Sequence, residues 1–158
     1  MSREPPPMRE KLEVDVTYAA RRPWVPRRRQ FEVWARAALD GLSCHSVLSI
    51  LVVGTARSRS LNARYRRKDR STNVLSFGGP GPSPDGRNYL GELVICAPVV
   101  AREALAQGKS RDSHWAHMTV HGVLHLLGFD HERDAEAAKM TAREIQILDQ
   151  LGFSNPYA

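Results

Sequence analysis

The chain has 158 residues, of which 42% are hydrophobic, so it can form one ordinary domain with a buried core but has no room for a second. Lys and Arg number 23 against 17 Asp and Glu, and the resulting charge of +6 favours polyanionic partners such as nucleic acid. The cysteines, Cys44 and Cys96, have no metal or redox spacing, so we expect reduced, buried thiols in a cytoplasmic protein. The sequence contains no run of about 18 apolar residues and no signal segment, so we expect neither a membrane span nor export.

The first third of the chain is dominated by strand patterns. Residues 1–10 are polar and rich in proline, and we expect a flexible tail before a single domain over residues 11–158. Alternating apolar residues predict a half-buried strand at 12–17, and apolar residues at helical spacing predict a helix at 31–42. The β-branched run at 46–53 predicts an inner strand.

The middle of the chain contains a strong break in these patterns. A short polar helix is expected at 55–65, followed by a strand at 74–77. Glycines and prolines at 78–86 predict a mobile hairpin connection that cannot hold a ladder. A returning strand at 89–96 and a helix at 98–108 follow.

The last third is expected to be helical. One helix is predicted at 112–127, and a final helix carries Met140, Ile145, Leu148 and Leu151 at its apolar positions. With strands early and helices late, the expected fold class is α+β, with a roughly four-stranded mixed sheet packed against helices.

Three histidines predict a metal site. His121, His125 and His131 have the spacing H-x3-H-x5-H, and residues four apart on a helix have Cβ atoms about 5 to 6 Å apart, close enough to bind one ion. Gly128 is the residue type that accepts the left-handed conformation ending a helix, so the chain can fold back and bring His131 to the same ion. We therefore expect one Zn²⁺ with an open fourth position, whereas His114 and His117 can be read simply as packed side chains.

This spacing also occurs in the H-E-x-x-H-x-x-G-x-x-H motif of metzincin proteases. Position 122 is a glycine here, so the glutamate that would act as general base beside a zinc-bound water is absent. A zinc peptidase is therefore disfavoured.

Five blocks of the sequence resemble the YbeY endoribonucleases, which are also called rRNA maturation factors. These blocks are His121–His131, Leu61–Phe77, Leu90–Ile95, His114–His117 and the ending Leu151–Tyr157. The resemblance implies a zincin-like metal helix and a single-strand-specific, zinc-dependent endoribonuclease. It also implies a role in rRNA processing, including 16S rRNA 3′ end maturation and ribosome quality control, with rRNA and the ribosome or small-subunit proteins as partners.

Arg66 stands where this family carries its functional arginine, so the resemblance implies that Arg66 and the metal ligand His121 are catalytic. A guanidinium can hold a phosphate through two parallel hydrogen bonds. The other basic residues of 57–70 are read either as a solvated face or as contacts along an RNA backbone. In the second case, charge reversal at Arg59 and Arg64 should weaken RNA binding and its dependence on salt.

Several roles stay open at the level of sequence. The general base could be Glu92, Asp130, His114 or His117, and Asp130 could instead orient a ligand histidine. The polar residues Asn62, Thr72, Asn73 and Ser76 could support loops or contact RNA. One alternative function is a ribosome-assembly RNA-binding factor whose zinc site is mainly structural. The oligomeric state is not indicated.

Overall fold

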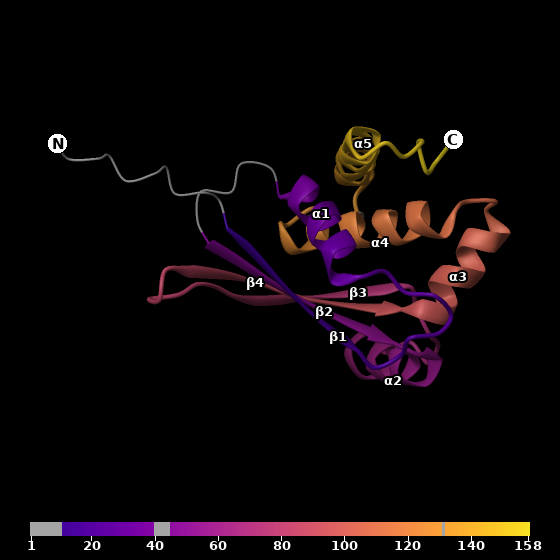
Figure 1. The fold of residues 1–158 in the computed structure, drawn as a ribbon, viewed down its shortest axis with the longest axis horizontal. Coiled ribbons are helices and arrows are strands. Elements are labelled where there is room, and N and C mark those ends of the chain that lie inside the picture. Colours follow the sequence, from indigo (N-terminus) through magenta and orange to yellow (C-terminus); the bar gives the residue numbers. More distant parts are fainter. Residues whose placement is uncertain (1–10, 40–44, 131) are drawn as a thin grey trace.

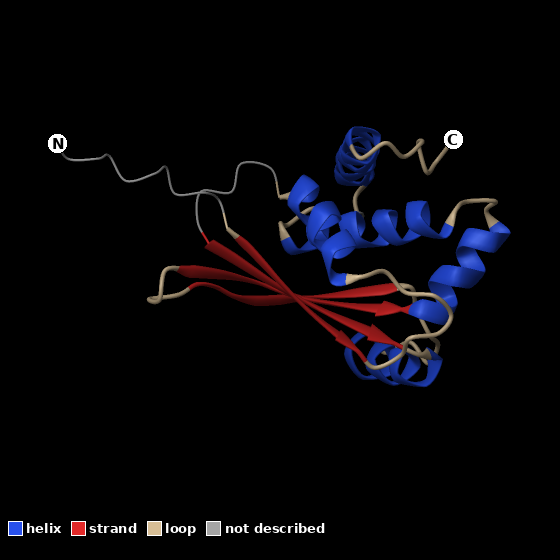
Figure 2. Ribbon diagram, viewed as in Figure 1, coloured by secondary structure: helices blue, strands red, loops and turns tan. Residues whose placement is uncertain are grey.

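The fold is built around a mixed sheet whose order is β1-β2-β4-β3. The computed structural model describes residues 11–39, 45–130 and 132–158. Within these residues, β1 (Leu12–Tyr18), β2 (His45–Val53) and β4 (Arg87–Cys96) run parallel, and β3 (Val74–Pro82) pairs antiparallel with β4 at the edge. The predicted α+β class and four-stranded mixed sheet are confirmed (Figure 2).

The helices divide unequally between the two faces of this sheet. In Figure 1, α1 (Arg28–Ala38) and α4 (Arg111–Leu126) lie on the upper face, and α5 (Asp134–Gln150) packs outside α4. The helix α3 (Ala97–Ala106) leads from the end of β4 back to α4, whereas α2 (Thr55–Arg66) lies below the sheet. No helix in the described ranges is both long and apolar enough to cross a membrane.

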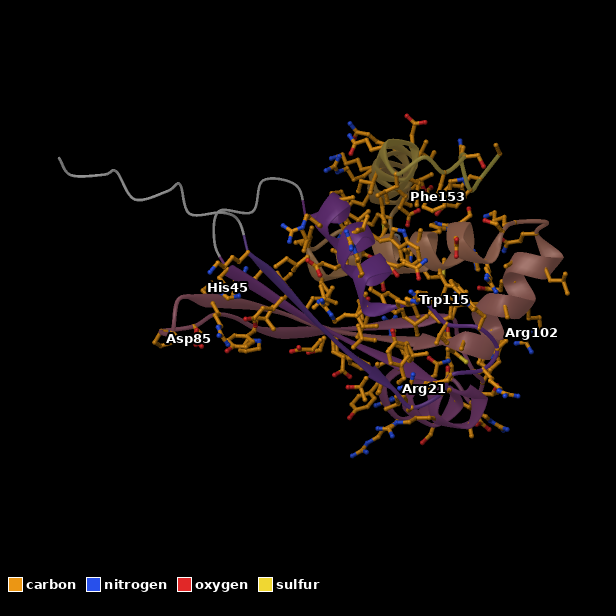
Figure 3. The ribbon with its side chains drawn as sticks, in the orientation of Figure 1. Arg21, His45, Asp85, Arg102, Trp115 and Phe153 are labelled. Atoms are coloured by element: carbon orange, nitrogen blue, oxygen red, sulfur yellow. The ribbon has the colours of Figure 1, made fainter. Side chains whose placement is uncertain are left out.

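The main core lies between the sheet and α4. Trp115, labelled in Figure 3, is 1% exposed and packs edge-to-face against Phe31 of α1, with ring centroids 5.9 Å apart. Successive side chains of a strand point to opposite faces. Accordingly, Leu93 and Ile95 of β4 join this core, whereas Cys96 belongs to a smaller cluster on the α2 face. Cys96 is buried and free as expected, and Cys44 lies outside the described residues.

The expected hairpin break at 78–86 is wrong in its first half, because β3 continues to Pro82. The ladder shifts register between Gly78 and Gly81, and a Cβ atom at Gly79 would lie 2.4 Å from the Tyr89 carbonyl oxygen. Glycine therefore allows the two backbones to approach, and proline is tolerated because β3 is an edge strand. The turn itself is short, with Asp85 at the tip in Figure 3.

Candidate functional site

A cleft of about 220 Å³ opens where α4, the end of α2 and β3 meet. It brings Arg66 from α2 together with His121 and His125 from α4, although 55 positions separate Arg66 from His121 in the sequence. The other residues that line it are Asn62, Lys68, Arg70, Thr72, Asn73, Val74, Leu75 and Ser76. The cleft is therefore rich in positive charge and in polar groups.

The two helical histidines of the predicted metal site lie against each other. The rings of His121 and His125 have centroids 4.7 Å apart and planes 78° apart. The helix ends as expected, because Gly128 has a φ of +97° and the Phe129 amide donates to the Leu124 carbonyl at 3.0 Å. His131 lies outside the described residues, so its place in the ligand set stays a prediction.

Helix α4 packs closely against the sheet at Gly122. A Cβ atom there would lie 2.8 Å from Cδ2 of Leu93 and 3.2 Å from Cγ2 of Val74. The hydroxyl of Ser76 donates to the Gly122 carbonyl oxygen at 3.1 Å and ties β3 to the same turn of α4. Position 122 thus faces the core, so a glutamate there would point into the sheet and not into the cleft.

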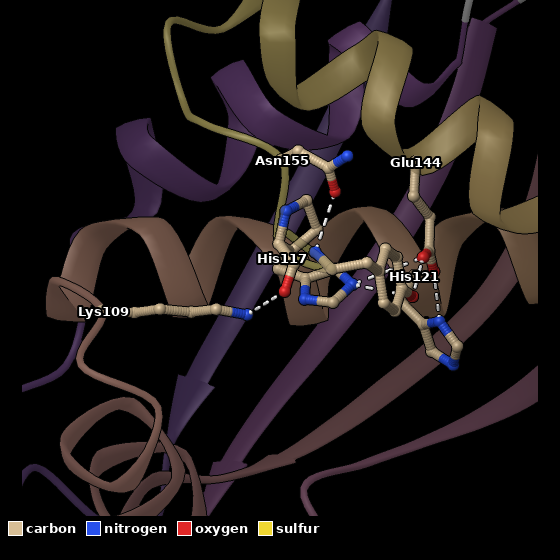
Figure 4. Close-up of polar contacts among 7 residues, drawn as sticks. Lys109, His117, His121, Glu144 and Asn155 are labelled. Carbon is tan, nitrogen blue, oxygen red and sulfur yellow. Dashed lines mark hydrogen bonds and ion pairs between the residues drawn. The ribbon is translucent and has the colours of Figure 1, made fainter.

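A buried carboxylate of α5 contacts His121 (Figure 4). Glu144 of α5 is 1% exposed, and it accepts hydrogen bonds from His121 Nδ1 and the Tyr157 hydroxyl. Its second oxygen is 3.3 Å from Nε2 of His117. Burial by itself would raise the pKa of Glu144, but the hydrogen bonds with His117, His121 and Tyr157 outweigh burial and lower this pKa to about 2.

Burial lowers the pKa of His117, and the contact with Glu144 only partly opposes that shift. Burial, together with the adjacent carboxylate, raises the pKa of Tyr157. The Glu144 carboxylate is thus ionised near neutral pH, and hydrogen bonds surround it.

Sequence reasoning missed Glu144. The available signal was an acid on an apolar helical face, because Glu144 falls in register with Met140, Ile147 and Leu148, all at most 2% exposed. Atoms of His117, His121 and Glu144 lie within 4.8 Å of one another, so this group could hold a metal ion. This group and the predicted set of three histidines share His121. Both therefore support a site for a metal ion near His121.

The loop after α2 is held in place from within the helix. Asn62 is 3% exposed and donates to the Arg70 carbonyl oxygen at 2.8 Å, and the Ser58 hydroxyl bonds both backbone groups of Thr72 at 3.0 Å. Arg67 adopts the left-handed conformation that ends α2, with a φ of +57°. Of the two open readings for these polar side chains, loop support is observed for Asn62, whereas the bonds of Thr72 to Ser58 are made by its backbone.

The basic stretch is not uniformly available to a ligand. Arg59 makes two hydrogen bonds to the Asp69 carboxylate, at 2.8 and 2.9 Å, and its expected contact with an RNA backbone stays a prediction. The guanidinium of Arg64 lies 5.6 Å from the ring centroid of Tyr65, which is 56% exposed. Arg64 is thus the better residue for probing contacts with an RNA backbone.

The candidates for a general base do not meet in the cleft. Glu92 faces the opposite side of the sheet, where a groove of about 500 Å³ separates α2 from the open half of β3 and β4. The Asp130 side chain accepts from the Glu132 amide at 3.0 Å, and buried His114 contacts Glu103 at 2.9 Å. Among the described residues that line the cleft, none is an aspartate or glutamate.

The fold and the cleft define a class of protein: an α+β domain in which a histidine pair on a helix faces an arginine. The profile of the family described as Endoribonuclease YbeY matches residues 24–152, and the chain belongs to this family. A protein of Stenotrophomonas maltophilia named Endoribonuclease YbeY is 51% identical over 152 residues, and one of Xanthomonas campestris with the same name is 50% identical over 154. Each alignment covers 94% of both chains.

The fold is also similar to that of a solved structure. The solution structure of a Thermotoga maritima protein aligns with a TM-score of 0.60 and 19% identity, and the alignment covers 87% of this chain and 88% of that one. This likeness shows the fold alone.

Proposed function

We propose that the chain is a single-strand-specific, zinc-dependent endoribonuclease that acts in rRNA processing, including maturation of the 16S rRNA 3′ end, and in ribosome quality control. Membership of the YbeY family supports a nuclease that hydrolyses RNA. The observation that carries the finer proposal is the meeting of Arg66, His121 and His125 in one cleft. Imidazoles can bind a metal ion and a guanidinium can bind a phosphate, and both contribute to metal-assisted phosphodiester cleavage.

The donor set fits zinc. His121, His125 and His131 would supply three neutral nitrogens, and the carboxylate behind His121 is the usual companion of a metal-ligating histidine. A zinc ion in such a site lowers the pKa of water towards about 7 and polarises a phosphoryl oxygen.

Arg66 would bind the scissile phosphate from the opposite wall. Its side chain extends from the last turn of α2, and Asn62 fixes the loop that follows. The planar guanidinium can contact two phosphate oxygens at once and can offset the negative charge that builds up as the bond breaks. Arg66 would therefore favour the transition state, whereas the neighbouring basic residues would add affinity that depends on salt.

A strand of RNA must bend to place one phosphate in so small a cleft. A volume of about 220 Å³, walled by α2, β3 and α4, cannot admit an A-form duplex, whose phosphates are fixed along two paired backbones. Single-stranded RNA is therefore the expected substrate.

The test combines metal analysis with cleavage of a small-subunit rRNA precursor. Wild-type protein should contain one zinc per chain and cleave, His125→Ala should lose both properties, and Arg66→Ala should lose cleavage while keeping zinc. Arg64→Glu should weaken RNA binding and flatten its salt dependence with zinc unchanged. Cleavage by Arg66→Ala at the wild-type rate would leave Arg66 as part of a solvated face.

The alternative is a ribosome-assembly RNA-binding factor in which zinc is mainly structural. It predicts that His125→Ala unfolds, or that folded His125→Ala supports ribosome maturation as well as wild type does. A zinc peptidase is not supported, because position 122 faces Leu93 and Val74.

A further inference from the structure

Glu144 contacts His121 without lining the cleft, and it is among the most deeply buried charged groups of the described chain. It is 1% exposed and lies on the apolar face of α5. An ionised carboxylate in such surroundings destabilises a fold unless hydrogen bonds surround it. A purely structural helix would carry an apolar residue at this position. The role of the carboxylate is therefore expected to involve its hydrogen-bond partners.

Those partners come from two segments, α4 and the stretch that follows α5 (Figure 4). One carboxylate oxygen accepts from Nδ1 of His121, and the other accepts from the Tyr157 hydroxyl and lies 3.3 Å from Nε2 of His117. The hydrogen bond at Nδ1 defines the tautomer of His121, because the Nδ1 proton leaves the lone pair on Nε2. The Nε2 atom is on the side of the ring away from Glu144.

The last residues of the chain hold this arrangement in place. The backbone amide of Tyr157 donates to Oδ1 of Asn155 at 2.8 Å, and Lys109 Nζ donates to the Pro156 carbonyl oxygen at 2.7 Å. The Tyr157 hydroxyl thereby reaches Glu144 although the tyrosine as a whole is 53% exposed. The C-terminal segment thus contributes to the hydrogen bonds around His121, which lies 36 positions before Tyr157 in the sequence.

We propose that Glu144 is a positioning residue that fixes the tautomer and ring orientation of His121 so that Nε2 binds the metal ion in the Arg66 cleft. His117 and Tyr157 fix the carboxylate in turn. The inference rests on the proposed zinc site at His121, His125 and His131. In this arrangement, His117 and Glu144 support a ligand of the zinc ion and do not themselves bind it. Both carboxylate oxygens already have hydrogen-bond partners, and Arg66 and His125 line the cleft while His117 and Glu144 do not.

The experiment measures zinc affinity by competition with a chelator, together with melting of the metal-free protein. Glu144→Gln keeps the size of the side chain but removes its charge, and it should lower zinc affinity by about 10- to 100-fold. Tyr157→Phe should lower it less, because it removes one hydrogen bond to the carboxylate and its ring is already half exposed. It serves as the second variant should Glu144→Gln fail to fold. In both, the metal-free protein should still show a cooperative melting transition, and the absorption bands of bound Co²⁺ should shift.

His125→Ala and His117→Gln separate the possible failures. Loss of zinc in His125→Ala, with weaker binding in Glu144→Gln, supports the inference. A second outcome is that His125→Ala loses zinc while Glu144→Gln and Tyr157→Phe both bind zinc with wild-type affinity. This outcome overturns the positioning role and leaves the proposed function intact. Zinc that persists in His125→Ala but is lost in His117→Gln places the ion in the His117, His121 and Glu144 group, and it overturns the inference and the proposed metal site together.

Discussion

Replacing Gly122 by alanine tests whether α4 is positioned by its contact with the sheet. In an exposed helix, this change would stabilise the protein by about 1 kcal/mol, because glycine is the poorest helix former after proline. Here the added Cβ atom would lie 2.8 Å from Cδ2 and 3.1 Å from Cδ1 of Leu93, and 3.2 Å from Cγ2 of Val74. Leu93 is fully buried, so its side chain cannot swing into solvent.

The expected magnitude follows from these two opposing effects. Forcing an extra methyl group into a packed core costs about 1 to 3 kcal/mol. After the helix propensity is subtracted, the free energy of unfolding should fall by about 1 kcal/mol, with an upper limit of about 2 kcal/mol. Because α4 carries His121 and His125, zinc affinity should fall as well.

Urea unfolding of wild type, Gly122→Ala, Leu93→Ala and the double variant measures the effect. Leu93→Ala alone should cost about 2 to 5 kcal/mol, but in its presence the alanine at position 122 should no longer destabilise. Gly122→Ala protein that is more stable than wild type by about 1 kcal/mol, the value for helix propensity alone, would refute the close packing.

Four further outcomes are expected. Arg66→Lys should keep zinc and charge but cleave RNA at least about tenfold more slowly, measured by single-turnover kinetics, because an ammonium lacks the planar two-point contact. Asn62→Ala should lower the free energy of unfolding by about 1 kcal/mol and reduce cleavage, since the Arg70 carbonyl loses its hydrogen bond to Asn62. An unchanged rate of RNA cleavage would show that this loop does not affect catalysis. Removing zinc with a chelator should lower the melting temperature and abolish cleavage, both restored by added zinc; cleavage by metal-free protein would contradict the proposal. The hydrogen bond from His114 lowers the pKa of Glu103, so this contact stabilises the fold fully above the ordinary carboxyl pKa of 4.5 and is lost as pH falls through the lower folded value. The difference in stability between wild type and Glu103→Gln, followed by urea unfolding, should therefore shrink towards acidic pH, and a difference independent of pH would rule this out.

The sequence by itself determined the elements and half of the site. Period-two alternation predicted β1, a β-branched apolar run predicted β2, and apolar residues at helical spacing predicted α1 and α5, because an element that buries one face repeats its apolar residues at its own spacing. The i,i+4 spacing of His121 and His125 and the stop at Gly128 were also readable, since both depend only on local helix geometry.

Tertiary structure decided the relations that local pattern does not encode. The extension of β3 to Pro82 depends on pairing with β4, which overrides the breaking tendency of glycine and proline in an edge strand. Glu92 proved to face away from the histidines, because the face that a strand residue occupies is fixed by how the sheet is covered. The approach of Arg66 to the α4 histidines, and of Glu144 and Tyr157 to His121, joins segments far apart in the chain, and only the packing of α2 and α5 around α4 and β3 could bring them together.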